Sequence, residues 1–180
     1  AVELLARVGF DPDRVLTDRT DAAGALYRTV VLDDLVGRFA RAHPDAVVVS
    51  AGAGLCARDR RLGPDLPGGV RWVAVDSADV IGMRADLVPE DPSDHVVASV
   101  GDPAWLDAVR VDGRPTFVIA EGLLMYLDEA GLRGFLTSVA GLPLASEAAA
   151  DVFHPKVALS DRHPIVKATG ARFRSGARNG

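Results

Sequence analysis

Four short apolar runs in the sequence end in residues that can bind a ligand. The residues that follow these runs are, in chain order, the pair Gly52 and Gly54, then Asp76, Asp102 and Glu121. Glycines let a ligand approach the backbone closely, and carboxylates accept hydrogen bonds from hydroxyl and amino groups. Each signal is modest alone, but their shared position at the ends of apolar runs makes them one candidate site.

The glycine pair and Asp76 together indicate a nucleoside site. Gly52 and Gly54 precede a predicted helix start, whose N–H groups have no helical partner. Asp76 lies 24 residues after Gly52, where a carboxylate can accept hydrogen bonds from both ribose hydroxyls. The alternative is that Asp76 caps the following helix, with Ser77 as a competing cap. We favour the nucleoside interpretation.

Two further acids suit the rest of a nucleoside ligand. Asp102 can accept a hydrogen bond from the exocyclic amino group of a base, and nearby Trp105 is either a residue beside the base or a core residue. Glu121 directly follows Phe-Val-Ile-Ala. A carboxylate in that position needs a partner, so Glu121 is a functional candidate.

The elements that position these residues alternate between strands and helices. Strands are predicted over 46–51, 71–75, 95–100, 116–120 and 148–153. Helical spacing of apolar residues is found from Leu32 to Phe39, from Val80 to Leu87 and, after Asp128 as N-cap, from Leu132 to Val139. This pattern predicts an α/β fold with a doubly wound, mainly parallel sheet. Ligands of such sheets bind beyond the carboxyl ends of the strands.

Length and composition favour a single domain. The chain has 180 residues, of which 48% are hydrophobic and 25% charged. We expect N-terminal helices over 1–45, a cofactor-binding core over 46–153 and a basic segment over 154–180. The net charge of −5 argues against nucleic acid as the main partner.

Location is predicted from the apolar runs and from cysteine usage. The longest apolar runs, such as Leu123–Tyr126, are far below the roughly 20 residues that a membrane span needs. We expect no signal peptide, and Cys56 is the single cysteine, which favours a reducing compartment. We therefore expect a cytoplasmic domain without membrane contact.

Two cofactor classes fit the glycine loop. The segment Gly-Ala-Gly-Leu-Cys-Ala also matches the dinucleotide fingerprint, so an NAD(P)-dependent oxidoreductase is one alternative. The acids after the third and fourth strands suit a mononucleoside better than a pyrophosphate-bridged pair. S-adenosylmethionine has a ribose, an adenine and an amino acid tail but no phosphate, and fits better. A non-catalytic nucleoside-binding domain is the second alternative.

Several segments together resemble the leucine carboxyl methyltransferase family, and above all its bacterial branch of tetracenomycin-type polyketide O-methyltransferases. The segments are Arg28-Thr29 with Leu32-Asp33, GAGLCAR, WVAVDSADVIGMR, VASVGDPAW and FVIAEGLLMYL. They cover Tyr27 to Leu136. The resemblance implies a Rossmann-like class I methyltransferase fold and S-adenosylmethionine as cofactor.

The resemblance also implies a role for each site residue. Arg28 would bind the carboxylate of the cofactor, Gly52 and the Gly54 loop would contact its amino acid part, and Asp76 would hold the ribose. Glu121 would stand near the methionine end. The residues expected around the adenine are Ser99, Val100 and Asp102.

The chain departs from the family pattern in two places and is shorter than its relatives. Cys56 and Ala57 stand where the family usually has Asp and Thr, which removes an acid near the cofactor. Ser77 and Ala78 replace the usual Leu-Pro or Phe-Pro after the ribose acid. Relatives continue into further strands, so we expect a sheet truncated at its C-terminal strands.

The acceptor is predicted to be an oxygen of a small, polyketide-like metabolite. The fourth strand is not followed by Asn/Asp-Pro-Pro-Tyr, which is typical of many amino-group methyltransferases. A carboxyl acceptor is already ionised near neutral pH and needs no base, whereas a hydroxyl would benefit from one. Candidate bases are His154, His163 and Asp151, and Cys56 is interpreted as a packing residue. The sequence predicts no metal site, and it leaves the catalytic residue and a homo-oligomer open.

Overall fold

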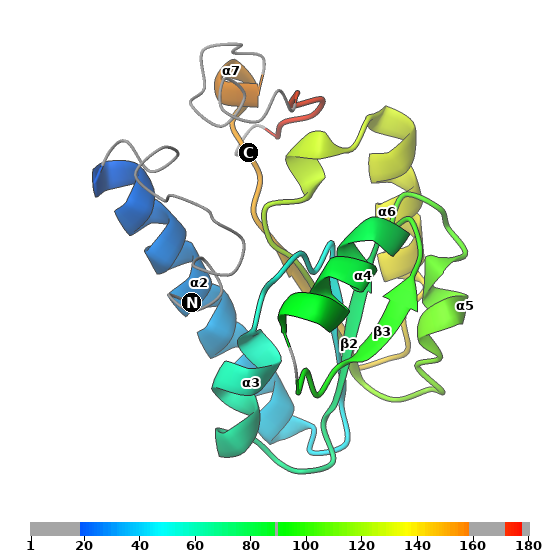
Figure 1. Cartoon of the computed structure of the whole chain (residues 1–180). Helices are drawn as coiled ribbons and strands as arrows, with labels where there is room; N and C mark the ends of the chain where they lie inside the picture. Colours follow the sequence, from blue (N-terminus) through cyan, green and yellow to red (C-terminus); the bar gives the residue numbers. More distant parts are fainter. Residues whose placement is uncertain (1–18, 89, 159–171, 178–180) are drawn as a thin grey trace.

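A five-stranded parallel sheet forms the centre of the molecule (Figure 1). The computed structural model describes residues 19–88, 90–158 and 172–177. The strands are β1 (Val47–Ala51), β2 (Arg71–Asp76), β3 (Asp94–Val97), β4 (Thr116–Ala120) and β5 (Glu147–Ala150). Their order is β3-β2-β1-β4-β5, and every neighbouring pair is parallel. The predicted α/β fold with a mainly parallel sheet is confirmed.

The register explains why the two edge strands are shorter than predicted. Val97 pairs with Asp76, the last residue of β2, and Ala150 pairs with Ala120, the last residue of β4. Beyond these pairs an edge strand has no neighbour to bond, so the chain leaves the sheet. The predicted strands 95–100 and 148–153 therefore span Asp94–Val97 and Glu147–Ala150 instead.

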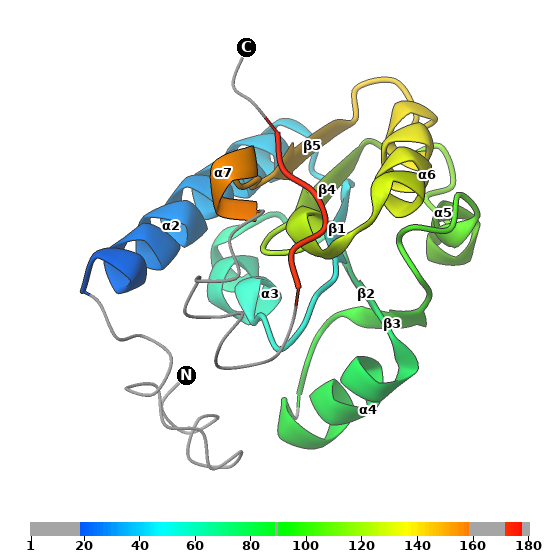
Figure 2. The same ribbon diagram turned by 90° about the horizontal axis from the view of Figure 1, so that it is seen from above.

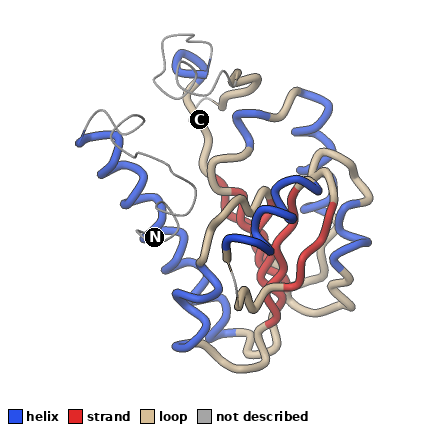
Figure 3. The backbone as a smooth tube through the Cα atoms, viewed as in Figure 1, coloured by secondary structure: helices blue, strands red, loops and turns tan. Residues whose placement is uncertain are grey.

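Helices cover both faces of the sheet (Figures 2 and 3). The long α2 (Arg19–Ala42) and the short α3 (Arg58–Leu62) pack with one buried cluster, which joins residues of α2 to β1 and β4. The other cluster joins the strands to α5 (Trp105–Val109) and α6 (Glu129–Ala140). The remaining elements are α4 (Ala78–Leu87), the 3-10 turns η2 (Gly63–Asp65) and η3 (Leu124–Tyr126), and α7 (Pro155–Ala158). None of the helices in the described ranges combines the length and the hydrophobicity that a transmembrane segment needs.

Three local predictions have different outcomes. Asp128 is the N-cap of α6, and its side chain accepts a hydrogen bond from the Gly131 amide, as predicted. Trp105 is a core residue, 2% exposed and stacked on Phe135. On α4 the expected apolar face is wrong at Met83, which is 46% exposed. The side chain that this helix buries is an arginine, because the loop after β1 offers it hydrogen-bond acceptors.

Candidate functional site

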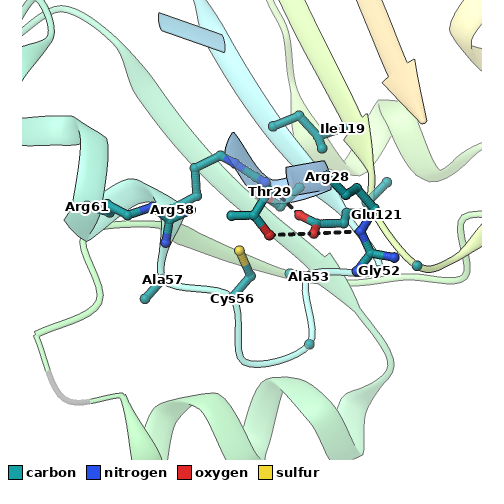
Figure 4. Close-up of a pocket in the computed structure, with 14 residues that line it drawn as sticks. Arg28, Thr29, Gly52, Ala53, Cys56, Ala57, Arg58, Arg61, Ile119 and Glu121 are labelled. Carbon is teal, nitrogen blue, oxygen red and sulfur yellow. Dashed lines mark hydrogen bonds and ion pairs between the residues drawn. The ribbon is translucent and has the colours of Figure 1, made fainter. Parts of the chain in front are cut away.

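A cavity of about 460 Å³ opens at the carboxyl ends of β1 and β4 (Figure 4). Its walls come from α2, from the glycine loop after β1, from the start of α3 and from the loop after β4. Four predicted site residues line it together: Arg28, Gly52, Gly54 and Glu121. Parallel strands present their carboxyl ends at one edge, and that edge is where the sequence placed the site.

The glycine loop adopts a conformation that its glycines make possible. Gly52 has φ of +65° and Gly54 has φ of +51°, the left-handed region that other residues rarely adopt. A Cβ atom on Gly52 would also lie 2.8 Å from Cδ1 of Leu123. The amides of Gly52 and Ala53 both donate to the carbonyl of Val75, so the loop folds back over the end of β2.

Asp76 faces the glycine loop. Its Oδ2 accepts a hydrogen bond from the Gly54 amide (2.9 Å), and its Oδ1 accepts one from the Ser77 amide (2.7 Å). Ser77 occupies the N-cap position of α4 but makes no side-chain capping bond. The alternative in which Asp76 caps α4 is therefore wrong, and the carboxylate lies where the end of β2 meets the loop.

Glu121 is the centre of an ion-pair network at the cavity (Figure 4). It accepts hydrogen bonds from Arg28 Nε (3.0 Å), Thr29 Oγ1 (3.0 Å) and Arg58 Nη2 (2.6 Å). Burial alone would raise the pKa of Glu121, but the hydrogen bond from Arg58 and the charges of Arg58 and Arg28 outweigh it and lower that pKa. The carboxylate therefore stays ionised inside the fold.

The network continues on both sides of Glu121. Arg58 Nε donates to Asp33 Oδ1 (2.7 Å), and Arg61 also binds Asp33 through two nitrogens. On the other side Arg28 Nη1 donates to Asp151 Oδ2 (2.8 Å). Three arginines thus face three carboxylates, so their formal charges cancel, while Arg28 Nη2 makes no hydrogen bond to the described residues.

Sequence reasoning missed the middle of this network. Arg58 is 2% exposed although it lies in the charged segment RDRRL, which has the composition of a solvated helix. Its partners Asp33 and Glu121 are 25 and 63 residues away along the chain. The available signal was that Asp33 and Arg58 both belong to the segments that resemble the family, Leu32-Asp33 and GAGLCAR.

The residues expected around the adenine lie beside the cavity and do not line it. Ser99 and Asp102 are exposed in the loop after β3, and Val100 is buried in the core. This loop is next to Asp76, because the Ala98 amide donates to the Asp76 carbonyl (3.1 Å). One oxygen of Asp102 accepts a hydrogen bond from the Ala104 amide (2.9 Å), and no donor in the described part of the chain reaches its second oxygen.

None of the candidate bases in the described residues lines the cavity. Asp151 is engaged by Arg28 and by the Gly122 amide (2.5 Å). His154 is exposed, and its Nδ1 accepts a hydrogen bond from the Lys156 amide (3.2 Å). His163 lies outside the described residues. Cys56 is partly buried on the cavity wall, and no group of metal-ligating side chains is found in the described ranges.

The sequence is similar to proteins of one family over most of its length. The sequence model of the leucine carboxyl methyltransferase family matches residues 3–140. The tetracenomycin polyketide synthesis O-methyltransferase TcmP of Streptomyces glaucescens is 38% identical over 99% of this chain and 66% of its own length. A candidate S-adenosyl-L-methionine-dependent methyltransferase of Frankia alni is 33% identical over 69% of this chain and 46% of its own. The chain thus spans two thirds or less of the length of these relatives.

Solved structures support the fold. A candidate methyltransferase from Thermobifida fusca is 21% identical, with a TM-score of 0.59 over 86% of this chain and 59% of that chain. LepI in complex with S-adenosylmethionine is 18% identical, with a TM-score of 0.52 over 73% of this chain and 34% of that chain. A structure described as a pericyclic reaction enzyme matches equally well, so the fold by itself does not identify the reaction.

Proposed function

We propose, from the premise that this chain belongs to the leucine carboxyl methyltransferase family, that it binds S-adenosylmethionine and transfers a methyl group to an oxygen of a small molecule. Membership of this family is what the sequence motifs predicted. It favours the methyltransferase hypothesis over the nicotinamide oxidoreductase, because the family model covers the glycine loop and all the acids at the strand ends.

The cavity suits the amino acid end of that cofactor. A zwitterion needs a cation for its carboxylate and an anion for its ammonium group, and Arg28 and Glu121 supply both on one wall. Arg28 Nη2, which has no acceptor among the described residues, is the donor offered to a carboxylate, and the ionised Glu121 is the acceptor for an ammonium. The positive φ of Gly52 and Gly54 lets the loop adopt the shape that forms one wall of this cavity.

The remaining contacts follow the sheet edge from β1 toward β3. Asp76 would accept hydrogen bonds from the ribose hydroxyls, because each oxygen of a carboxylate has two lone pairs and only one is in use. The loop with Ser99, Val100 and Asp102 would hold the adenine on the outer side of Asp76. The bound cofactor supplies an electrophilic methyl group on a sulfonium; the chain contributes binding, orientation and exclusion of water.

The state of the candidate bases supports a carboxylate as acceptor. Glu121 is the acid on the cavity wall, and its lowered pKa makes it a weak base. Asp151 is paired with Arg28 and does not line the cavity. A carboxylate acceptor is ionised near neutral pH and needs no base. The name of TcmP places that relative in polyketide synthesis. For this chain we therefore propose a small, polyketide-like carboxylic acid as the methyl acceptor.

The observation that carries the proposal is the joint placement of Arg28, Glu121 and the glycine loop around one cavity. Isothermal titration calorimetry with S-adenosylhomocysteine, NAD and NADP tests it. We expect S-adenosylhomocysteine alone to bind, and Asp76→Ala to weaken it at least about tenfold, since the variant loses charge-assisted hydrogen bonds. Asp94→Ala, an exposed acid paired with Arg71 at the opposite end of the sheet, is the control with unchanged affinity. Binding of a nicotinamide nucleotide alone would contradict the proposal.

A further inference from the structure

Arg84, a buried arginine on α4, donates hydrogen bonds to the glycine loop. Arg84 is 1% exposed, although the apolar Met83 beside it faces solvent. Its Nη1 donates to two carbonyls of the loop, those of Gly54 (3.0 Å) and Cys56 (2.8 Å). The loop therefore accepts hydrogen bonds from a helix that begins two residues after Asp76.

The opposite side of the guanidinium is fixed by an acid. Asp91 Oδ2 accepts from Arg84 Nε (3.0 Å) and from its Nη2 (2.5 Å), and lies 2.9 Å from His95 Nε2. Asp91 Oδ1 accepts from the Ser93 amide (3.0 Å). Burial would raise the pKa of Asp91, but hydrogen bonds with Asp59 and His95 and the charge of Arg84 lower it. Asp91 therefore remains a charged anchor for Arg84.

Gly54 is consequently held at both of its peptide groups. Its N–H donates to Asp76 Oδ2, and its carbonyl accepts from Arg84. A ligand that binds Asp76 competes for the carboxylate that holds the N–H of Gly54. Arg84 binds the carbonyls of Gly54 and Cys56 and not the N–H that Asp76 holds. It can therefore keep the loop in place while Asp76 exchanges the Gly54 N–H for a ligand hydroxyl.

We infer that Arg84 is a positioning residue for the cofactor loop: it fixes the carbonyls of Gly54 and Cys56 so that the loop keeps its ligand-binding shape when Asp76 binds ribose. The inference rests on the proposed function for the identity of the ligand. The held loop itself is a property of this chain's own contacts. A loop ordered before binding has less conformational entropy to lose on binding, and therefore binds more tightly.

The chain offers a control arginine that makes the same kinds of hydrogen bond, although its side chain is more exposed, at 29%. Arg71 Nη1 also donates to two carbonyls, those of Val109 and Arg110 (both 2.9 Å), and its Nε also donates to an aspartate, Asp94 (2.6 Å). These contacts lie at the amino ends of the strands, away from the glycine loop. Arg84→Met and Arg71→Met thus remove the same kinds of hydrogen bond from opposite ends of the sheet.

The experiment measures loop protection and affinity in both variants. Hydrogen–deuterium exchange of peptides over 52–57 reports on the loop directly, because the amides of Gly52, Ala53, Gly54 and Cys56 are all hydrogen-bonded. We expect at least about tenfold faster exchange there in Arg84→Met, and unchanged exchange in Arg71→Met. The Kd for S-adenosylhomocysteine should rise about tenfold in Arg84→Met alone, with partial recovery in Arg84→Lys, which can still reach one carbonyl.

The outcomes separate this inference from the proposed function. Unchanged exchange and unchanged Kd in Arg84→Met would overturn the inference and leave the function standing. No binding to the wild-type chain would overturn the function, while the exchange of 52–57 would still decide the role of Arg84. If Arg84→Met does not fold, Arg84→Lys and Asp91→Asn replace it, and normal loop exchange in both would overturn the inference.

Discussion

The arginines beside the cavity and Arg114 at the opposite end of the sheet make different kinds of contact. At the carboxyl end, Arg28 and Arg58 pair with carboxylates that come from other elements and surround a cavity. At the amino end, Arg114 donates to the backbone carbonyls of Asp45 (2.5 Å) and Gly69 (2.8 Å). Arg28 and Arg58 therefore neutralise carboxylates beside the cavity, whereas Arg114 holds two loops together through their backbone.

This difference indicates that the carboxyl end of the sheet is suited to bind charged ligand groups. A carboxylate or ammonium group of a ligand can share or replace partners in a network of ion pairs, and the cavity beside Glu121 gives it room. The acceptors of Arg114 are neutral backbone carbonyls, which a charged ligand group cannot replace as it can replace a carboxylate. Mutations at the carboxyl end should thus change both stability and affinity, whereas those at the amino end should change stability alone.

The largest expected effect is that of Arg58→Met. The variant leaves Asp33 and Glu121 without their buried cation, and breaking one side of a buried ion pair costs about 3–5 kcal/mol. Urea unfolding followed by tryptophan fluorescence measures this loss. Arg114→Met should cost about 1 kcal/mol, because it removes hydrogen bonds whose acceptors can turn to water.

Arg61→Met is the internal control for the carboxyl end. Arg61 binds the same Asp33, but its side chain is 44% exposed, so the loss should stay below about 1 kcal/mol. Equal unfolding free energies for Arg58→Met and Arg61→Met would contradict the view that burial distinguishes the two pairs.

Alanine at Gly134 and at Gly69 tests whether disturbing each end of the sheet changes affinity as well as stability. A Cβ on Gly134 of α6 would lie 2.1 Å from the Gly101 carbonyl oxygen, and a Cβ on Gly69 would lie 2.6 Å from the Pro44 carbonyl oxygen. Both alanine variants should lose about 2 kcal/mol, because backbone must move in each. Gly134→Ala should also weaken S-adenosylhomocysteine binding, since it displaces the loop before Asp102. A similar loss of affinity in Gly69→Ala would contradict the claim that changes at the amino end of the sheet affect stability alone.

The sequence predicted the sheet well because its central strands are buried on both faces. Val47, Val48 and Val49 are fully buried, and such a β-branched run has few alternatives to a strand. The lengths of β3 and β5 were overestimated, since an edge strand ends where its neighbour ends and not where its own apolar residues end.

The site was predicted only in part for a related reason. Residues that directly follow a strand, such as Gly52 and Glu121, could be placed from local sequence. Arg58 and Arg84 could not, because their burial depends on acceptors that only the folded chain brings near. Local composition does not mark either arginine as buried, since RDRRL is charged and ADVIGMRADL is mixed.

Acid sensitivity should also be concentrated at the carboxyl end. The pKa values of Asp33 and Glu121 are lowered despite burial, so both stabilise the fold above their ordinary values of 3.8 and 4.5 and lose that contribution as pH falls through the folded-state values. Asp59, whose pKa is raised by burial and by its hydrogen bond with Asp91, has the opposite sign. The net expectation is a steep loss of Tm below about pH 4.5 in the wild type.

Glu121→Gln isolates the contribution of one carboxyl group. The variant should melt below the wild type at about pH 7 and approach it as pH falls through the lowered pKa of Glu121, where the wild-type carboxylate is itself protonated. Thermal melts across that range check this. A gap in Tm that stays constant with pH would show that charge at Glu121 does not stabilise the fold.

The smallest expected effect on ligand binding concerns the exposed side of the proposed site. Asp102 has one carboxylate oxygen available, and we expect it to accept a hydrogen bond from the amino group of adenine. Asp102→Ala should then weaken S-adenosylhomocysteine about fivefold, because one hydrogen bond in a solvated position contributes about 1 kcal/mol. S-inosylhomocysteine lacks that amino group, so its affinity should be the same for the wild type and the variant. If Asp102→Ala weakens both ligands equally, the side chain acts by holding the Ala104 turn, and the adenine contact at this end of the sheet has to be sought elsewhere in the loop after β3.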